Sequence, residues 1–333
     1  MRRIVGIDVA RGLAVLGMMT AHVGPDDHGP VPPGGFSQLA DGRPSALFVV
    51  LAGVSLALLS GGARPVAGPA MTRARARVVV RALLVLVLGV LLVALGTPVI
   101  VILPTYAVLF VAGSATLGWS RRALVVAAVA FAVLGPPLAR WIAPDAPDQN
   151  TPLGLFVGPE YPALIWMSYL LTGLAVGRCD LRSRPLRRAG VLLGAGLVVI
   201  GHGGAWLAGH VSTWPTDLTT SAPHSSSTFE VVGNTGVAFL VIAASLAAGE
   251  RWPRGVAPLA AVGALALTAY TVHIVVIAIV GDSVVYDPTV LGWLAFLGVT
   301  VVACWTWARF LGRGPLEQVM HEVSTRAADA PVG

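Results

Sequence analysis

Apolar runs recur from one end of the 333-residue chain to the other, and this recurrence limits what the chain can fold into. A helix crosses the ~30 Å hydrocarbon core of a membrane with ~20 mostly apolar residues. Strands of a membrane barrel would instead show short segments of alternating polarity. We therefore predict an all-α polytopic membrane protein, a bundle of about ten transmembrane helices. The ten runs cover residues 4–23, 44–59, 78–95, 98–117, 123–142, 161–176, 189–208, 232–248, 256–280 and 290–308.

The composition excludes a soluble globular domain. Apolar residues make up 56% of the chain and charged residues only 11%, whereas an average soluble domain is roughly a quarter charged. The formal charge of +6 comes from arginine alone, because the chain has no lysine. This bias, together with many Ala, Gly, Val and Pro residues, is typical of a GC-rich bacterial genome. The two cysteines, Cys179 and Cys304, form neither a disulfide framework nor a metal-binding spacing.

The arginines predict an orientation in the bacterial plasma membrane. With the N-terminus in the cytoplasm, 19 of the 22 arginines fall on the cytoplasmic side of the ten spans. Cytoplasmic loops of membrane proteins carry such an excess of positive charge, so both termini are expected to be cytoplasmic. We expect one transmembrane domain over residues 1–312 and a short cytoplasmic tail over residues 313–333. Pro136 and Pro137 are expected to kink or end the helix at residues 123–142.

The first predicted helix carries polar residues along one face. Asp8 and Arg11 are three residues apart and can pair, and His22 follows eleven residues later, about 16 Å along the same face. Charged side chains are costly inside a bilayer and are usually functional. The simpler alternative is that the Asp8–Arg11 pair only fastens the bundle and that His22 ends the helix at the interface.

Most histidines fall on the opposite side from the arginines. Six of the seven map to the outer half or the outer loops. Histidine exchanges protons near neutral pH, whereas arginine clusters bind phosphates. This polarity suits a phosphate-bearing donor inside and a proton-accepting step outside. His273 is placed to face His22, and Asp41 can orient a histidine or pair with Arg43. The Ser/Thr-rich outer loop at residues 219–227 is interpreted as a solvated linker. No spacing supports a metal site, and none is expected.

These segments resemble known membrane acyltransferases. Residues 7–14 (IDVARGLA) and 39–55 (LADGRPSALFVVLAGVS) resemble the catalytic domain of heparan-α-glucosaminide N-acetyltransferase. The segments LTAYTVH at 267–273 and GPLE at 314–317 resemble the C-terminal half of a related, poorly characterised bacterial membrane family. Arg11 and His22 also match the Arg-x10-His signature of integral-membrane acyltransferases of type 3.

The resemblance implies an enzyme that passes an acetyl or other short acyl group from cytoplasmic acyl-CoA to an outer acceptor, often a sugar. The glucosaminide family indicates His28 as the active histidine and the type 3 family indicates His22, which we favour. His273 and Asp41 are further catalytic candidates.

For the donor, Asp8 would hold Arg11 against the pantetheine or carbonyl end. The inner arginines Arg73, Arg75 and Arg77 would bind the CoA phosphates. The expected partners are acyl-CoA, membrane lipids and a sugar or glycoconjugate of the cell envelope, with no nucleic acid; homo-oligomers are compatible with this interpretation.

Two other function classes stay open at this point. A transporter or lipid-binding membrane protein without chemistry also carries paired intramembrane charges. A structural partner with degenerate catalytic residues would bind no CoA.

Overall fold

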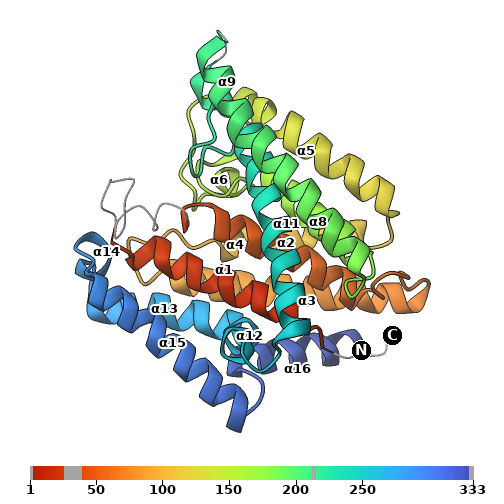
Figure 1. The fold of residues 1–333 in the computed structure, drawn as a ribbon, viewed down its shortest axis with the longest axis vertical. Coiled ribbons are helices and arrows are strands. Elements are labelled where there is room, and N and C mark those ends of the chain that lie inside the picture. The colour runs from red at the N-terminus through yellow and green to blue at the C-terminus, as the bar shows by residue number, and fades with distance from the viewer. Residues whose placement is uncertain (1–2, 26–39, 212, 214, 330–333) are drawn as a thin grey trace.

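The computed structural model describes residues 3–25, 40–211, 213 and 215–329. Within these residues the chain is helical and contains no strand. Figure 1 shows a bundle in which α1 runs through the middle. The helices are α1 (Val5–Val23), α2 (Arg43–Leu59), α3 (Pro69–Val93), α4 (Leu103–Thr116), α5 (Arg121–Ile142), α6 (Pro152–Val157), α7 (Ala163–Gly177), α8 (Arg184–Val198), the π-helical turn η2 (Val199–Gly203), α9 (Gly204–Val211), α10 (Thr216–Thr219), α11 (Thr228–Arg251), α12 (Ala257–Ala264), α13 (Ala266–Val280), α14 (Ser283–Tyr286), α15 (Val290–Phe310) and α16 (Pro315–Asp329).

Several helices are long and apolar enough to cross a membrane. Five helical spans of the described chain meet this condition by length and composition: α3, α5, α8 through α9, α11 and α15. On α15 only 6% of the most apolar window is buried inside the protein. A surface this apolar fits lipid rather than water. The protein is therefore a multi-pass helical membrane protein.

Each of the ten predicted apolar runs contains a helix or a broken helix of the structure. Helices α2, α4 and α7 are apolar but have only 10–17 residues. Helices α12 and α13 form a sixth candidate span that is bent by 79°. The all-helical class is confirmed, whereas ten crossings and cytoplasmic termini stay predictions.

Helix α1 packs against α2, α11 and α12 at the centre of the bundle. The approach to α12 depends on two glycines: a Cβ atom on Gly263 would lie 1.8 Å from the carbonyl oxygen of Asp8, and one on Gly12 would lie 2.1 Å from that of Leu259. No side chain fits at these distances. The two backbones therefore touch directly, just before α12 gives way to α13.

Helix α5 continues through Pro136 and Pro137, so of the two expected effects, a kink or an end of the helix, the end does not occur. A proline lacks the N–H that would bond to the carbonyl four residues earlier, which for Pro136 is that of Ala132. The Thr228 hydroxyl at the start of α11 donates a hydrogen bond to this carbonyl oxygen at 2.9 Å. The neighbouring helix thus supplies the missing donor.

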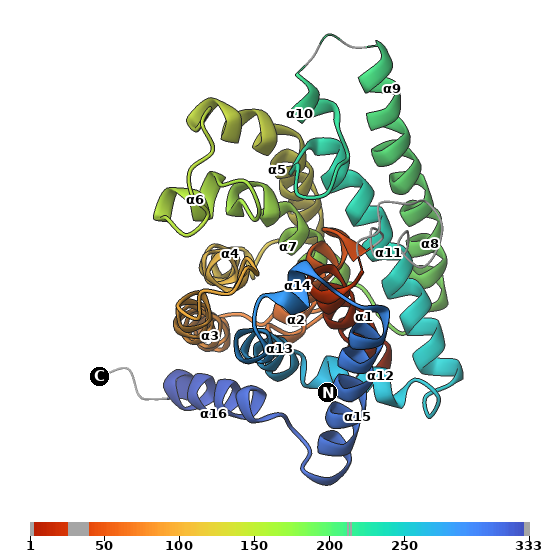
Figure 2. The same cartoon turned by 90° about the vertical axis from the view of Figure 1, so that its left-hand side faces the viewer.

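Helix α16 lies along the bundle rather than apart from it (Figure 2). It packs against α3 and α13. The Arg81 Nε of α3 donates to the Ser324 hydroxyl of α16 at 3.2 Å. The segment predicted as a C-terminal tail therefore begins with a packed helix; its cytoplasmic location stays a prediction.

Candidate active site

The first half of α1 holds a charged group inside the bundle. Asp8 is 5% exposed and accepts hydrogen bonds from Arg3 Nε at 2.5 Å and from Arg11 Nη1 at 3.0 Å. Arg11 Nη2 donates to the hydroxyl of Ser55 on α2 at 2.8 Å. Arg11 is thus held at both ends of its guanidinium, which fixes its direction.

Arg11 borders a cavity of about 300 Å³. The wall contains the charged groups of Arg81 and Glu317 and the Tyr106 ring, and it is otherwise mostly apolar. The remaining lining residues are Phe48, Ala52, Ser55, Val85, Leu103, Phe110, Gly263, Ala264, Ala266, Leu267 and Met320. A mainly apolar cavity with a few directed polar groups is the usual form of a small-molecule site.

The other half of α1 brings two histidines together. His22 Nδ1 lies 3.0 Å from Nε2 of His273 on α13, and the two rings stack with their centroids 5.2 Å apart. One nitrogen of the pair must carry the shared proton while the other accepts. His273 is 2% exposed and His22 is half-buried, so His22 is the member that an outside molecule can reach. The Tyr270 ring contacts His273 edge-on at 5.0 Å.

The start of α13 is fixed from α16. The Glu317 carboxylate accepts hydrogen bonds from the backbone N–H groups of Leu267 at 2.8 Å and Thr268 at 3.0 Å, and from the Thr268 hydroxyl at 2.6 Å. The first N–H groups of a helix have no partner within the helix, and a carboxylate satisfies them well. The GPLE segment thus sets the direction of the helix that carries His273.

The predicted donor arginines lie on α3. Arg73 and Arg75 are exposed and Arg77 is half-buried. The pKa of His321 on α16 is lowered, first by burial and then by the positive charges of Arg313, Arg81 and Arg77. Positive charge therefore gathers where α3 and α16 meet. Arg81 lines the cavity. The sequence analysis did not predict this position for Arg81.

Two predicted residues stand apart from these groups. Asp41 directly precedes Gly42 and α2, and it is engaged in a contact of its own. His28 lies outside the described residues. Among the described residues no group of three or more His, Cys, Asp or Glu side chains is arranged to hold a metal ion.

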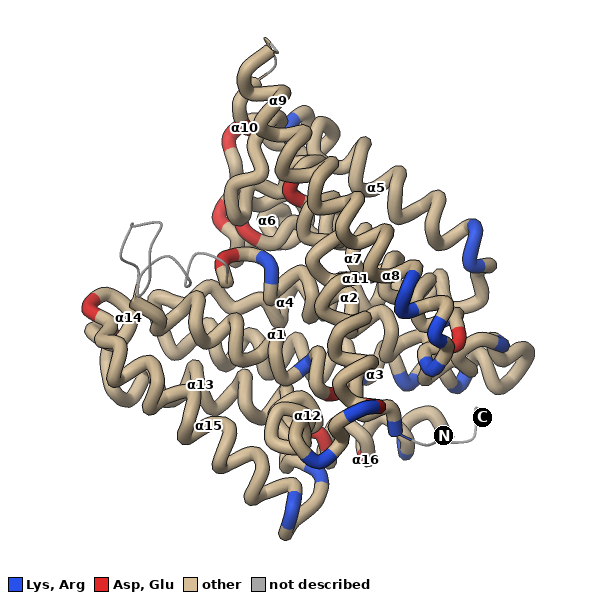
Figure 3. The backbone as a smooth tube through the Cα atoms, in the orientation of Figure 1, with Lys and Arg blue, Asp and Glu red and all other residues tan. Residues whose placement is uncertain are grey.

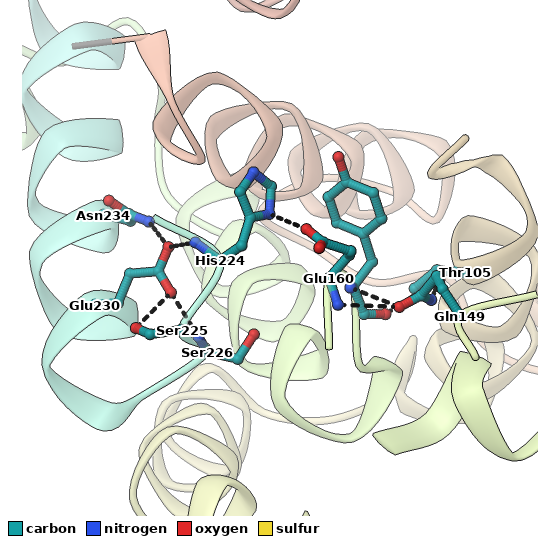
Figure 4. Close-up of polar contacts among 9 residues, drawn as sticks. Thr105, Gln149, Glu160, His224, Ser225, Ser226, Glu230 and Asn234 are labelled. Atoms are coloured by element: carbon teal, nitrogen blue, oxygen red, sulfur yellow. Dashed lines mark hydrogen bonds and ion pairs between the residues drawn. The ribbon is translucent and has the colours of Figure 1, made fainter. Parts of the chain in front are cut away.

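Figure 4 shows a polar cluster that sequence analysis missed. His224 Nδ1 lies 3.2 Å from a carboxylate oxygen of Glu160, and the His224 ring contacts the Tyr161 ring edge-on at 5.4 Å. His224 belongs to the loop interpreted as a solvated linker. The two residues are 64 positions apart, so no local spacing signal could have joined them.

The fold defines a multi-pass helical membrane protein, with a mainly apolar cavity beside Arg11 and a histidine pair at the other half of α1. Residues 3–202 match the family described as heparan-alpha-glucosaminide N-acetyltransferase, catalytic, and the chain belongs to this acyltransferase-type membrane family. Residues 176–327 match a protein family of unknown function, DUF418. The family resemblance inferred from the sequence is thereby confirmed. A comparison with curated proteins finds no match.

Proposed function

We propose that this protein is an acetyl-CoA-dependent membrane acyltransferase of the bacterial plasma membrane. It takes an acetyl or other short acyl group from cytoplasmic acyl-CoA and delivers it to an extracytoplasmic sugar or glycoconjugate of the cell envelope. One observation carries the proposal: a single face of α1 bears both Arg11 and His22. Arg11 borders the cavity, and His22 is paired with His273. The two residues are about 16 Å apart along the helix. The family match supports acyl transfer as the chemistry.

The donor enters from the arginine-rich end. Arginines gather at the end of the bundle where the N- and C-terminal labels lie (Figure 3). Arg73, Arg75 and Arg77 bind the CoA phosphates, because guanidinium groups match phosphate oxygens in charge and geometry. The pantetheine arm then runs through the cavity past Arg11, and its thioester faces His22.

His22 acts as the general base. It takes the proton from a hydroxyl or amine of the acceptor, whose oxygen or nitrogen attacks the thioester carbonyl carbon. The carbon–sulfur bond breaks, the proton passes to the thiolate, and the products are the acylated acceptor and free CoA thiol. His273 holds the His22 ring in position through the shared proton. His28 remains the alternative base.

The base assignment is tested with His22→Ala. The measurement is transfer of labelled acetyl from acetyl-CoA to a cell-envelope extract by detergent-solubilised full-length protein. Loss of a general base lowers the rate by about 100-fold or more. His210→Ala is the control, because among the described residues this exposed histidine at the end of α9 contacts the carbonyl oxygen and the ring of Trp206, one turn earlier on the same helix. A His22→Ala protein at full rate would rule out the role.

The donor assignment is tested by replacing Arg73, Arg75 and Arg77 with Ala together. Binding of acetyl-CoA should weaken by about tenfold or more, because several charge-assisted contacts are lost. The control replaces Arg121 and Arg122 at the start of α5. Unchanged acetyl-CoA affinity in the triple variant would remove the arginines from the donor site.

The bend of 79° between α12 and α13 favours a second candidate function. Broken helices often mark the binding sites of transporters. Saturable uptake of an intact solute into proteoliposomes, without release of CoA from acetyl-CoA, would support a transporter instead.

A further inference from the structure

The His224–Glu160 pair is built from two loops that each have a dedicated side chain to hold them. The Glu230 carboxylate of α11 is 5% exposed and accepts from the backbone N–H groups of His224 at 2.9 Å and Ser226 at 2.6 Å. It also accepts from the Ser225 hydroxyl and the Asn234 amide, both at 3.2 Å. Three of these four hydrogen bonds hold the loop, and the fourth comes from Asn234 on α11 itself (Figure 4).

The Glu160 side of the pair is held in the same way. Gln149 is 7% exposed, and its side-chain oxygen accepts from the backbone N–H groups of Glu160 and Tyr161, both at 3.1 Å. Its amide nitrogen reaches the Thr105 hydroxyl of α4 at 3.5 Å. A buried side chain therefore fixes the backbone beneath each member of the pair, as in a preorganised binding site.

The backbone at His224 supports a functional role. The backbone angle φ is +60° at His224 and +49° at Ser226. Both values lie in the left-handed region that non-glycine residues rarely adopt. Such conformations cost energy and persist where the surroundings enforce them, commonly at functional sites. Here the Glu230 carboxylate enforces them, and it turns the imidazole towards Glu160.

The orientation leaves one ring nitrogen available. A carboxylate beside Nδ1 favours the proton on that nitrogen, so Nε2 presents its lone pair. Among the described residues neither ring nitrogen of His224 makes a hydrogen bond, and the buried Nδ1 contacts Glu160 as an ion pair alone. Both side chains are 29% exposed, so a molecule from outside can reach them. The His224 loop lies against the residue before α2, since a Cβ atom on Gly42 would be 3.6 Å from the His224 backbone nitrogen. The start of α2 in turn lies against the His22 half of α1, where a Cβ atom on Gly17 would be 2.6 Å from the Pro44 ring.

We propose that His224 and Glu160 bind and orient the sugar acceptor next to His22 and select against phosphorylated sugars. This rests on the proposed function and adds to it the residues that choose among acceptors. His224 Nε2 accepts a hydrogen bond from a sugar hydroxyl or amine, and Glu160 positions His224. The carboxylates of Glu160, beside the His224 ring, and of Glu230, beneath its backbone, disfavour an acceptor that carries phosphate at this point.

The test uses full-length protein, labelled acetyl-CoA and D-glucosamine as the probe acceptor. His224→Gly keeps the left-handed backbone and removes the imidazole. We expect the KM for glucosamine to rise about tenfold or more, as for a lost hydrogen bond in a binding site, with kcat within about twofold of wild type. Added imidazole should lower the KM again, which a purely structural defect would not allow. Glucosamine 6-phosphate should be a poorer acceptor than glucosamine.

Three variants complete the design. Ser226→Gly, at the neighbouring left-handed position, keeps its backbone N–H for Glu230 and should behave as wild type. His224→Asn tolerates the same φ, and it should show the raised KM even if the glycine variant folds poorly. Glu160→Gln should give a smaller rise in KM, because it weakens only the positioning of His224.

The outcomes separate the two proposals. Transfer of labelled acetyl to the cell-envelope extract tests the proposed function independently of glucosamine. If wild type transfers acetyl neither to the extract nor to glucosamine, the proposed function fails and this inference with it. If wild type acetylates the extract but not glucosamine, the acceptor class is wrong. If transfer occurs and His224→Gly and His224→Asn keep the wild-type KM, or lose kcat alone, the subsite is overturned.

Discussion

At the residue scale, Asp8 stands between two arginines inside the bundle, with a side chain that is 7% exposed. Asp8→Asn would leave Arg11 with less compensation for its charge. Removing one member of a buried ion pair costs about 3 kcal/mol, and we expect this loss in the free energy of unfolding. Unfolding in mixed micelles measures it.

Ser55→Ala is the matched control for Asp8→Asn. It removes one hydrogen bond from Arg11 but keeps the Asp8–Arg11 pair, so its cost should be about 1 kcal/mol. An Asp8→Asn protein no less stable than Ser55→Ala would contradict the importance assigned to the buried pair.

Some residue contacts were accessible from the sequence and others were not. The Asp8–Arg11 pair is confirmed, because a spacing of three residues puts both side chains on one helical face. The contacts of Arg11 with Ser55 and of His22 with His273 join residues 44 and 251 positions apart. Local spacing carries no information about such pairs, although the sequence did place His22 and His273 at the same level of the membrane.

At the element scale, Thr228→Val tests how α5 passes through its prolines. The variant leaves the Ala132 carbonyl without its donor, and we expect a loss of about 1 kcal/mol in unfolding free energy. In a Pro136→Ala background the alanine N–H can serve that carbonyl, so the same Thr228→Val change should cost less. Equal costs in the two backgrounds would contradict the compensation.

Glu317→Gln tests the attachment of α16 to the start of α13. The amide keeps an oxygen acceptor but loses the negative charge that favours the N-terminus of α13. We expect faster hydrogen exchange at the Leu267 and Thr268 amides and a lower acyl-transfer rate, because α13 also carries His273. The control is Gln318→Ala on the same helix, whose exposed side-chain amide donates to Glu322 of α16 itself. Unchanged exchange in Glu317→Gln would contradict this role.

At the scale of the whole molecule, the predicted orientation is tested with single cysteines in a Cys179→Ser, Cys304→Ser background. Thr216→Cys lies in the segment before α11 that is predicted to be outside, and Thr72→Cys lies near the start of α3, which is predicted to be inside; both positions are exposed. In intact cells a membrane-impermeant thiol reagent should label only Thr216→Cys. After the cells are opened it should label both. Labelling of Thr72→Cys alone in intact cells would invert the topology.

The sequence by itself determined the all-helical membrane class, the family and the position of each apolar helix. These properties depend on composition, run length and local motifs, which can be recognised along the chain. Only the tertiary structure revealed the cavity beside Arg11, the contact of His22 with His273, the packing of α16 and the pairing of His224 with Glu160. Each brings together side chains from helices or loops far apart in the sequence, and such proximity depends on how helices cross. The crossing of α1 and α12 at Gly12 and Gly263 illustrates the reason: both glycines were visible, but their contact requires the packed bundle.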